Sequence, residues 1–544
     1  MPDQAIATAP PPQEEKAASA KTTGLVSLAI FTSRIMGLVR DVLMARFFSP
    51  YLRDCFNVAF RTPNMLRDLF AEGALSTAFV SVFSKKIKLE GDAPAWSLAH
   101  KMLTLATIFM SLISVCGVLV APLLVRLLAN GWSEEKLKFT ILLAQIMYPF
   151  ILLVSLAALV MGMLNSKKVY GAPAMASTYF NITSIVVGIG LGWCFDRSMG
   201  WIAMVWFSIG TLFGGLAQLA SQLPALRKIG YRFRWDAAWK KDEGVRKILS
   251  LMWPAIIAGG AVQVNVLLNT IFASHIEGDK DGPVSWLGYA FRLMQLPLGV
   301  FGVAVATVTL PVISRAATEG ITDNFRRALG AGNRLVLFLC IPCAIGLFLL
   351  ASPLISLLFE RGKFSGYETA KTAGILRYYA IGLVFYALIK VIQPAFTAID
   401  RRFVPMMVAA GSVVINAGLN YCFIIFWKLG PEYLAFSTAV VACLNCLVLY
   451  FTLTKISHGL ENEKLLQTLL RLALPLAALT AVCVLASQTV LVRERWEHCS
   501  FLLKSLALGG TLALAGSLYL GLATWLKVDE ARQFSQIVFR KLKR

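Results

Sequence analysis

Apolar segments about 20 residues long recur from end to end of this 544-residue chain. A segment of this length crosses the hydrocarbon core of a bilayer as one α-helix, which satisfies its backbone hydrogen bonds internally. Hydrophobic residues make up 57% of the chain and charged residues 15%, against about 25% in an ordinary soluble domain. The sequence therefore predicts an all-α polytopic membrane protein and excludes a soluble or a disordered chain.

The apolar pattern predicts about fourteen spans. Their approximate limits are 24–47, 55–86, 97–129, 137–164, 174–195, 199–226, 247–274, 284–314, 328–358, 372–398, 404–427, 431–455, 466–490 and 500–526. Several of these segments are longer than the hydrocarbon core is thick, so we expect tilted helices or helices that protrude into water.

The net charge is +22, from 52 Lys and Arg residues against 30 Asp and Glu residues. Basic residues gather in loops after even-numbered spans, such as Lys167 and Lys168, and in the tail that ends at Arg544. Because cytoplasmic loops collect Lys and Arg, we expect both termini in the cytoplasm. Membrane orientation accounts for most of the charge excess, so we expect membrane lipids and no nucleic acid as partners.

Both ends of the chain lie outside the apolar pattern. Residues 1–21 are polar and rich in Pro and Ala, which predicts a disordered tail and not a signal peptide. The basic segment 528–544 predicts an amphipathic helix, at about 528–541, that lies on the membrane surface.

Short motifs repeat at long range. Ala59-Phe60-Arg61 recurs as Ala290-Phe291-Arg292, and the basic turn after residue 166 recurs after residue 400. An offset near 231 residues equals six spans, an even number, so we expect two parallel repeats with a substrate site between them. The predicted division is a tail (1–21), an N-terminal lobe (22–228), a basic cytoplasmic linker (229–246), a C-terminal lobe (247–456), a pair of helices (457–527) and the basic segment 528–544.

Four arginines lie within three of the predicted spans. Arg34 and Arg40 lie in the first span, Arg67 lies in the second beside Asp68, and Arg292 opens the eighth. Each arginine costs about 2.5–3.5 kcal/mol at the centre of a bilayer, so we expect these side chains to face a hydrated cavity. They outnumber the local acids, which predicts an anionic substrate, and the planar guanidinium suits phosphate.

Other arginines have a simpler interpretation. Arg46 and Arg315 lie near helix ends, where a snorkelling side chain reaches water. Arg67 and Asp68, adjacent on one helix, are expected to point apart.

The motifs of several enzyme classes are missing. The sequence contains no Walker A motif, no recognisable pair of catalytic carboxylates, no nucleophile elbow and no metal-ligand cluster. We therefore predict a transport protein without catalytic residues, metal or cofactor.

Two segments carry a family resemblance. They are Ser33-Arg34 with Gly37 and Arg40-Asp41, and the stretch from Asn57 through Pro63-Asn64-Met65-Leu66-Arg67 to Glu72-Gly73-Ala74. With the stretch 292–302, they resemble the MurJ (MviN) family of lipid II flippases, and the similarity covers essentially the whole chain after the tail.

The resemblance implies the exporter fold of the MOP superfamily, with two six-helix lobes and two C-terminal helices that form a groove for a lipid tail. It implies transport of lipid II, the undecaprenyl-diphosphate-linked peptidoglycan precursor, between the leaflets of the bacterial inner membrane. Other cell-wall synthesis proteins are further partners that it suggests.

The resemblance also assigns residues. The arginines essential in the family map onto Arg34, Arg40, Arg67 and Arg292, which we expect to bind the substrate. Asp54 and Glu72 fall where the family has functionally sensitive acids. The residues expected to support the cavity or a gate are Asp41, Asp54, Arg61, Asn64, Glu72, Ser285 and Lys390.

The sequence departs from the family pattern at two places. Some members have an acid where this chain has Phe291, and some bind sodium through acids on the seventh and eleventh spans. Those spans here offer Asn265, Asn269, Asn416 and Asn420, for which hydrogen bonds between helices are an equal explanation. The membrane potential and a monovalent cation are both left open as energy sources.

Our hypothesis is a flippase that works by alternating access. Three alternatives remain: a flippase or exporter of the same superfamily for other lipid-linked sugars or for drugs, a membrane enzyme that acts on lipid diphosphates, and a scaffold for cell-wall enzymes. The arginines argue against a drug exporter and a scaffold, and no acid–base or metal motif supports the enzyme.

Overall fold

The computed structural model describes residues 13–278, 281–318 and 320–532. Within these ranges the chain consists of helices and their connections, with no strand. Eleven helices among the described residues are long and apolar enough to cross a membrane. The three remaining predicted spans, 24–47, 55–86 and 247–274, overlap α1 (Gln13–Phe47), α2 (Pro50–Leu66) to α3 (Ser76–Glu90), and α10 (Glu243–Ala273). The all-α polytopic class is confirmed.

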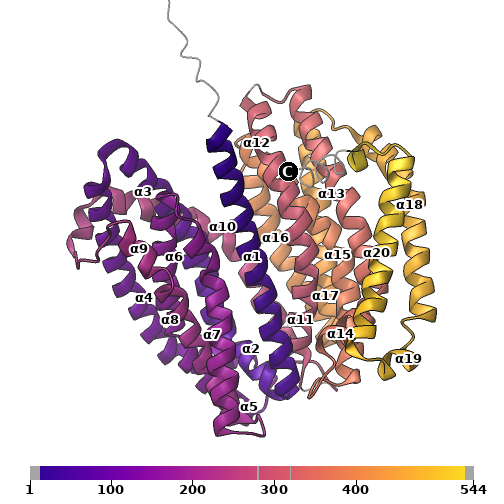
Figure 1. The fold of residues 1–544 in the computed structure, drawn as a ribbon, viewed down its shortest axis with the longest axis horizontal. Helices are drawn as coiled ribbons and strands as arrows, with labels where there is room; N and C mark the ends of the chain where they lie inside the picture. Colours follow the sequence, from indigo (N-terminus) through magenta and orange to yellow (C-terminus); the bar gives the residue numbers. More distant parts are fainter. Residues whose placement is uncertain (1–12, 279–280, 319, 533–544) are drawn as a thin grey trace, which may run out of the picture. The chain divides into compact units, whose positions relative to one another are not determined.

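The elements follow one another closely along the chain (Figure 1). The first are α1 (Gln13–Phe47), α2 (Pro50–Leu66), the π-helix η1 (Arg67–Leu75), α3 (Ser76–Glu90), α4 (Asp92–Leu128), α5 (Glu134–Met147), α6 (Phe150–Ser166), α7 (Gly171–Phe195), α8 (Trp201–Ala220), α9 (Leu223–Lys228) and the 3-10 helix η2 (Ala238–Lys241). The others are α10 (Glu243–Ala273), α11 (Pro283–Pro297), the π-helix η3 (Leu298–Gly302), α12 (Val303–Thr318), α13 (Asp323–Leu349), α14 (Ala351–Phe359), α15 (Gly366–Ala398), α16 (Phe403–Asn420), the π-helix η4 (Tyr421–Phe426), α17 (Glu432–Ile456), α18 (Asn462–Thr489), α19 (Arg493–His498) and α20 (Phe501–Trp525).

The chain forms two compact units. Unit 1 comprises Met1–Phe48, Cys55–Arg126 and Ser133–Gly260. Unit 2 comprises Ser49–Asp54, Leu127–Trp132 and Ala261–Arg544. The chain therefore enters unit 2 briefly at the start of α2 and again after α4, before the long second unit begins within α10.

The order of elements is duplicated at the offset seen in the sequence. Corresponding elements begin 230 to 232 residues apart: α1 and α10 at Gln13 and Glu243, α4 and α13 at Asp92 and Asp323, α7 and α16 at Gly171 and Phe403, and α8 and α17 at Trp201 and Glu432. Even the π-helices match, since η1 begins at Arg67 and η3 at Leu298, again 231 residues apart. A π-turn adds a residue to a helical turn and often marks a functional position, and here it falls directly after the second helix of each repeat.

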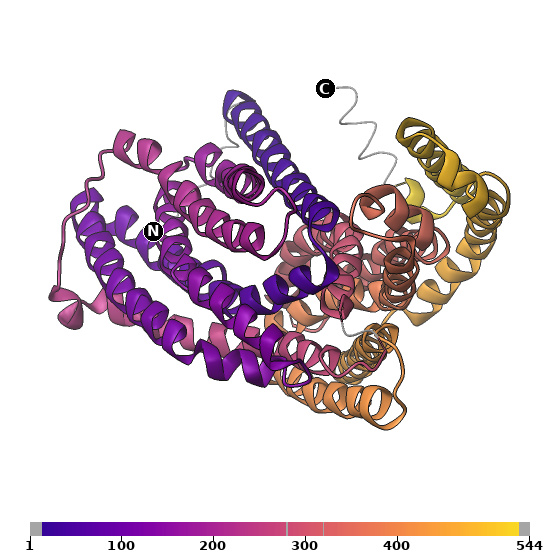
Figure 2. The ribbon, with the colours of Figure 1, turned by 90° about the horizontal axis from the view of Figure 1, so that it is seen from below.

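Close backbone packing joins α7 and α8 in unit 1, where the two helices run side by side (Figures 1 and 2). A Cβ atom added at Gly210 would lie 2.6 Å from the Cα atom of Gly188, and one at Gly214 would lie 2.8 Å from the carbonyl oxygen of Phe180. Small residues let helix backbones approach in a membrane, where packing replaces the hydrophobic effect as the attractive force.

In unit 2, α15 packs against α11, α12, α13, α14 and α17. The pair α18 and α20 packs on α13 and α14 (Figure 2). The hydroxyl of Tyr519 donates to the carbonyl oxygen of Phe338 at 2.6 Å, which fixes α20 against the middle of α13.

An ion cluster fastens the ends of this pair. Arg334 on α13 donates to Glu461, just before α18, and to Glu530, after α20, each at 2.9 Å. Burial opposes ionisation of Glu461, but hydrogen bonds from Lys464 and Arg334 outweigh it and lower the pKa of that carboxyl. One arginine therefore holds both ends of the α18–α20 pair on the second repeat.

Two sequence expectations concern the ends of the chain. The structure begins α1 at Gln13, so residues 13–21, expected to be part of a disordered tail, are helical because the Ala-rich stretch continues into the apolar span. The rest of that tail, residues 1–12, lies outside the described residues. The amphipathic segment expected at about 528–541 is described only as far as residue 532, where one helical turn covers 529–532.

Replacing Arg334 tests the ion cluster. We expect Arg334→Ala to cost about 2 kcal/mol of stability, less than a fully buried pair, because it leaves the buried Glu530 without its partner. The measurement is the apparent Tm of the detergent-solubilised protein. Lys464→Ala, which removes an exposed partner of Glu461, should leave the Tm nearly unchanged. Equal Tm values for both variants and wild type would contradict the assignment.

Candidate functional site

The buried carboxylate of Asp54, at the start of α2, caps another helix. It accepts hydrogen bonds from the backbone N–H of Gly282 at 2.8 Å, the N–H of Ser285 at 2.8 Å and the Ser285 hydroxyl at 2.5 Å. Those N–H groups belong to the first turn of α11, where they lack partners within the helix and where the helix dipole favours an anion. The sequence analysis named Asp54 and Ser285 separately, and the structure brings them into contact.

The neighbouring residue, Arg53, makes a second buried link. Its side chain is fully buried and pairs with Glu368 at the start of α15. Glu368 also accepts from the indole N–H of Trp286 at 2.9 Å and closes a capping box with Ser365. The guanidinium lies 5.2 Å from the ring centre of Phe364. Removal of one partner from a buried ion pair strongly destabilises the folded protein, because the other charge stays buried without compensation.

Sequence reasoning missed Arg53, Trp286 and Glu368. The Ser365-x-x-Glu368 pattern is a readable helix-start signal. The pairing with Arg53, 315 residues away, is not readable from one sequence. Together the two sites attach the start of α2 to α11 and α15, which explains why Ser49–Asp54 belongs to unit 2 while the next residue, Cys55, returns to unit 1.

The candidate arginines of unit 1 differ in their surroundings. Arg34 on α1 is exposed, whereas Arg40 is half-buried, contacts Asp41 at 3.4 Å and lies 5.6 Å from the ring centre of Phe180. Asp41 is buried. The acid and the aromatic ring hold the guanidinium of Arg40 in place.

The expectation that Arg67 and Asp68 point apart is wrong. Nε and Nη2 of Arg67 donate to one oxygen of Asp68, at 3.1 and 2.8 Å. The pair opens η1, where the wider turn changes the angle between successive side chains, and the long arginine side chain folds back onto its neighbour.

The remaining candidates are spread over both units. Arg61 is half-buried, and Asn64 contacts Asp68 at 3.5 Å, while the side chain of Glu72 is outside the described part of the structure. In unit 2, Arg292 on α11 is half-buried and Lys390 on α15 is exposed. Because Arg34, Arg40 and Arg67 belong to unit 1 and Arg292 to unit 2, their shared cavity stays a prediction.

Asparagines of the seventh and eleventh predicted spans form a hydrogen-bond network in unit 2. The amide of Asn420 donates to Asn269 at 2.8 Å and to Asn416 at 2.7 Å, and its oxygen accepts from Ser437. Asn269 donates in turn to Thr438 at 3.2 Å. These bonds join α10, α16 and α17, which is the role between helices that the sequence suggested.

An apolar cavity of about 340 Å³ lies in unit 2 between α11 and η3, α13, α14 and the pair α18 and α20. Phe301, Pro342, Cys483, Gly516 and Tyr519 are among the residues that line it. We call it the helix-pair cavity. Its almost wholly apolar walls suit a hydrocarbon chain and not a polar ligand.

A duplicated all-α bundle with many membrane-spanning helices, charged residues within its spans and an apolar side cavity defines a multi-pass membrane transporter. Residues 43–507 match the family described as lipid II flippase MurJ. The chain belongs to this MurJ family, whose members are proteins of the bacterial inner membrane.

Individual relatives agree with this assignment. The chain is 35% identical to a probable lipid II flippase MurJ of Rhizobium meliloti, over 92% of this chain and 93% of the relative. It is 34% identical to the lipid II flippase MurJ of Burkholderia cenocepacia, over 79% and 83%.

Solved structures extend the similarity to the fold. A lipid II flippase MurJ in an inward closed conformation matches with a TM-score of 0.73 and 25% identity, over 91% of this chain and 98% of that one. An inward-facing multidrug resistance MATE transporter of the MOP superfamily matches with a TM-score of 0.68 at 15% identity, over 78% and 94%, which shows a shared fold.

A double-mutant cycle tests the Asp54 site. We expect Asp54→Ala to lower the apparent Tm more than Ser285→Ala, because it orphans three buried donors and the serine change removes one bond. The pair should show a coupling energy of about 1.5–3 kcal/mol, as for hydrogen bonds to a charged group. Ser412→Ala, at a buried serine on α16 that bonds only its own helix, is the control for a lost hydroxyl. Additive effects of the two changes would refute the contact.

Proposed function

We propose that this chain flips lipid II from the cytoplasmic to the periplasmic leaflet by alternating access. The observation that carries the proposal is the match to the lipid II flippase family across residues 43–507. Relatives named as lipid II flippases align over nearly the full length of the chain, so both repeats and the helix pair are included.

The substrate presents two chemistries to the protein. Its diphosphate is anionic, and a charge has a high free-energy cost in the hydrocarbon core. It therefore needs positively charged donors along its path across the membrane. We assign Arg34, Arg40 and Arg292 to the diphosphate, because a guanidinium donates in pairs and stays charged. Arg67 either joins them or acts as a latch, and a phosphate at Arg67 would compete with its bond to Asp68.

The prenyl tail needs an apolar path. The helix-pair cavity offers one in unit 2, against α18 and α20, the elements that have no counterpart in the first repeat. In this proposal part of the tail enters this cavity while the remainder stays in lipid, so the tail is never exposed to water.

The Asp54 and Arg53 links supply a gate. The predicted orientation places the start of α2 at the periplasmic end of its span. Opening toward that side would release the Ser49–Asp54 segment from unit 2, which means breaking the cap on α11 and the ion pair to α15. Such a switch has two discrete arrangements, as alternating access requires.

Energy for the cycle is left open between the membrane potential and a coupled monovalent cation. A charge that crosses the whole potential gains about 2.3 kcal/mol per 100 mV, so a charged cavity responds to voltage. The asparagine network provides neutral oxygen atoms and no carboxylate, and they already accept hydrogen bonds.

Replacing Arg292 tests the diphosphate site. We expect Arg292→Ala to abolish transport, while Arg315→Ala, on the following helix α12 near its end, keeps it. The assay measures lipid II exposed on the outer leaflet of cells that are depleted of their own flippase and supply this chain instead. Both variants need wild-type levels in the membrane and a wild-type Tm.

The outcomes separate function from site. Exposure restored by wild type and by Arg292→Ala alike would keep the flippase and remove Arg292 from the site. Failure of folded wild type to restore exposure would refute lipid II as substrate, and the same assay with another lipid-linked oligosaccharide would then follow.

Filling the helix-pair cavity tests the tail path. Gly516 lines the cavity, and a Cβ atom added there meets no other atom within 4 Å, so the side chain of Gly516→Leu starts in open space. We expect at least a several-fold loss of transport with an unchanged Tm, since the leucine occupies the space of the tail. Gly521→Leu adds the same side chain on the same helix, outside the cavity, and should transport normally. Normal transport by Gly516→Leu would exclude the cavity from the path.

A further inference from the structure

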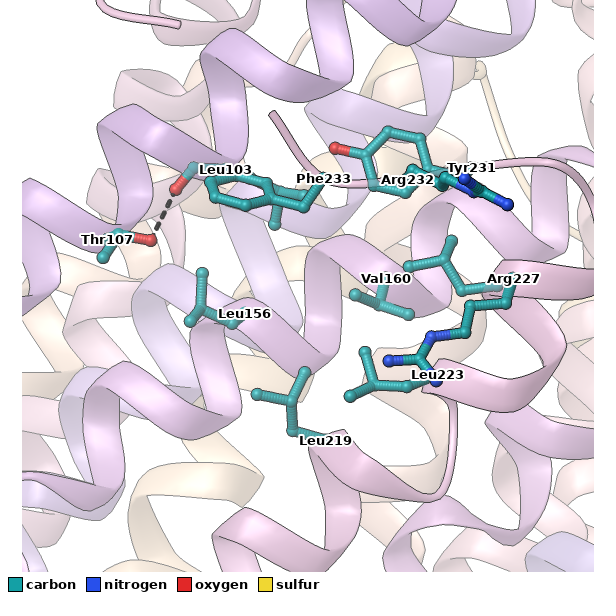
Figure 3. Close-up of a pocket in the computed structure, with 11 residues that line it drawn as sticks. Leu103, Thr107, Leu156, Val160, Leu219, Leu223, Arg227, Tyr231, Arg232 and Phe233 are labelled. Carbon is teal, nitrogen blue, oxygen red and sulfur yellow. Dashed lines mark hydrogen bonds between the residues drawn. The ribbon is translucent and has the colours of Figure 1, made fainter. Parts of the chain in front are cut away.

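A second, larger cavity lies in unit 1, far along the sequence from the helix pair. It has a volume of about 710 Å³ and is enclosed by α4, α6, α8, α9 and the loop after α9 (Figure 3). This volume is within the roughly 300–1,000 Å³ of ordinary ligand sites. We call it the linker cavity, because part of its wall comes from the segment 229–246.

The linker cavity combines an apolar interior with a basic rim. Leu103, Leu156, Val160 and Leu219 line the interior, and Figure 3 shows Arg227 and Arg232 together on one side of it. Both arginines are exposed. A ligand that fits has an anionic head, which two guanidinium groups can bind, and a hydrocarbon part, which the leucines can cover.

The loop that covers the cavity is anchored to α4. Tyr231 is buried, and its hydroxyl lies 3.0 Å from Nδ1 of His100. The backbone N–H of Arg234 donates to the same nitrogen at 3.2 Å, so Nδ1 is an acceptor and the tyrosine hydroxyl donates. Burial raises the pKa of Tyr231, which keeps that proton in place. The backbone N–H of Asp236 donates to the hydroxyl of Thr104 at 3.1 Å. This third bond helps to hold the loop against α4.

The helix α4, which lines the cavity, has a different neighbourhood from its counterpart α13 in the second repeat. By the offset of α4 and α13, Thr107 corresponds to Phe338, which α18 and α20 cover in unit 2. The first repeat has no such pair among its described elements. Beyond Thr107 the side chains of Ile108 and Leu112 are exposed. The cavity therefore opens beside a bare apolar helix, where lipid acyl chains fit.

We infer that the linker cavity binds an anionic phospholipid of the cytoplasmic leaflet, with the phosphate at Arg227 and Arg232 and an acyl chain among the leucines. The positive-inside rule assigns this basic linker to the cytoplasmic face, where anionic head groups are concentrated. Charge complementarity selects an anionic lipid over a neutral one. The residues that line the cavity include none of the arginines assigned to the diphosphate, and the inference does not depend on the proposed transport activity.

Native mass spectrometry of the full chain in detergent tests the inference, with phosphatidylglycerol as probe. We expect Arg227→Gln with Arg232→Gln to weaken binding about tenfold or more. The matched control is Lys240→Gln with Lys241→Gln, which removes two charges from the same linker away from the cavity and should change binding less than about twofold. Phosphatidylethanolamine with the same acyl chains should bind weakly, and so should inorganic phosphate.

A third variant tests the acyl chain without changing charge. Leu219 corresponds by the repeat offset to Tyr450, so Leu219→Tyr introduces into the cavity a residue that the second repeat accommodates at that position. We expect it to weaken phosphatidylglycerol binding about as much as the double arginine variant, at an unchanged Tm.

Four results would overturn the inference. They are unchanged binding in the arginine variant, equal losses in the arginine and lysine variants, unchanged binding in folded Leu219→Tyr, and saturation by inorganic phosphate alone. Displacement of phosphatidylglycerol by an equal concentration of lipid II would assign the cavity to the transported lipid instead. The lipid II exposure assay is independent of all these measurements, so failure here leaves the transport proposal separately testable.

Discussion

A charged side chain inside the membrane protein needs an opposite charge, hydrogen-bond partners or a hydrated cavity. This constraint organises the polar residues of the protein. Asp54 obeys it by accepting three hydrogen bonds at the start of α11, and Arg53 by pairing with Glu368 under an aromatic wall. Both links are buried, so breaking them has a high cost unless new partners appear at the same moment. In the proposed cycle, release of this segment would break both links together, which would make its movement a switch between two states.

The same constraint separates two kinds of arginine. Arg53 and Arg334 are paired with carboxylates from distant segments and hold elements together. Arg40 and Arg67 each pair with the acid next to them in the chain and are only partly buried. Solvent still reaches the side chains of Arg40 and Arg67, so a diphosphate can contact them, whereas the fully buried Arg53 is out of its reach.

Duplication gives the two repeats one framework, and their surroundings make them different. The helix that α18 and α20 cover in the second repeat corresponds to α4, whose apolar side chains stay exposed in the first. One repeat therefore carries an apolar cavity lined partly by the added helix pair, and the other carries a cavity with a basic rim beside an exposed apolar helix. Both cavities suit hydrocarbon, and the charge at the rim decides which lipid each would hold.

The sequence by itself determined the all-α membrane class, the approximate position of the spans and the repeat offset, because hydropathy and local motifs are properties of short segments. Charges within the apolar spans indicated the arginines, and the family resemblance added Asp54 and Ser285 as candidates. Only the tertiary structure decided that Asp54 caps α11, that Arg53 pairs with Glu368, and that Arg67 folds back onto Asp68 in a π-turn. These contacts depend on which helix ends meet and how a turn widens, and neither is encoded in the local pattern that sequence reasoning reads.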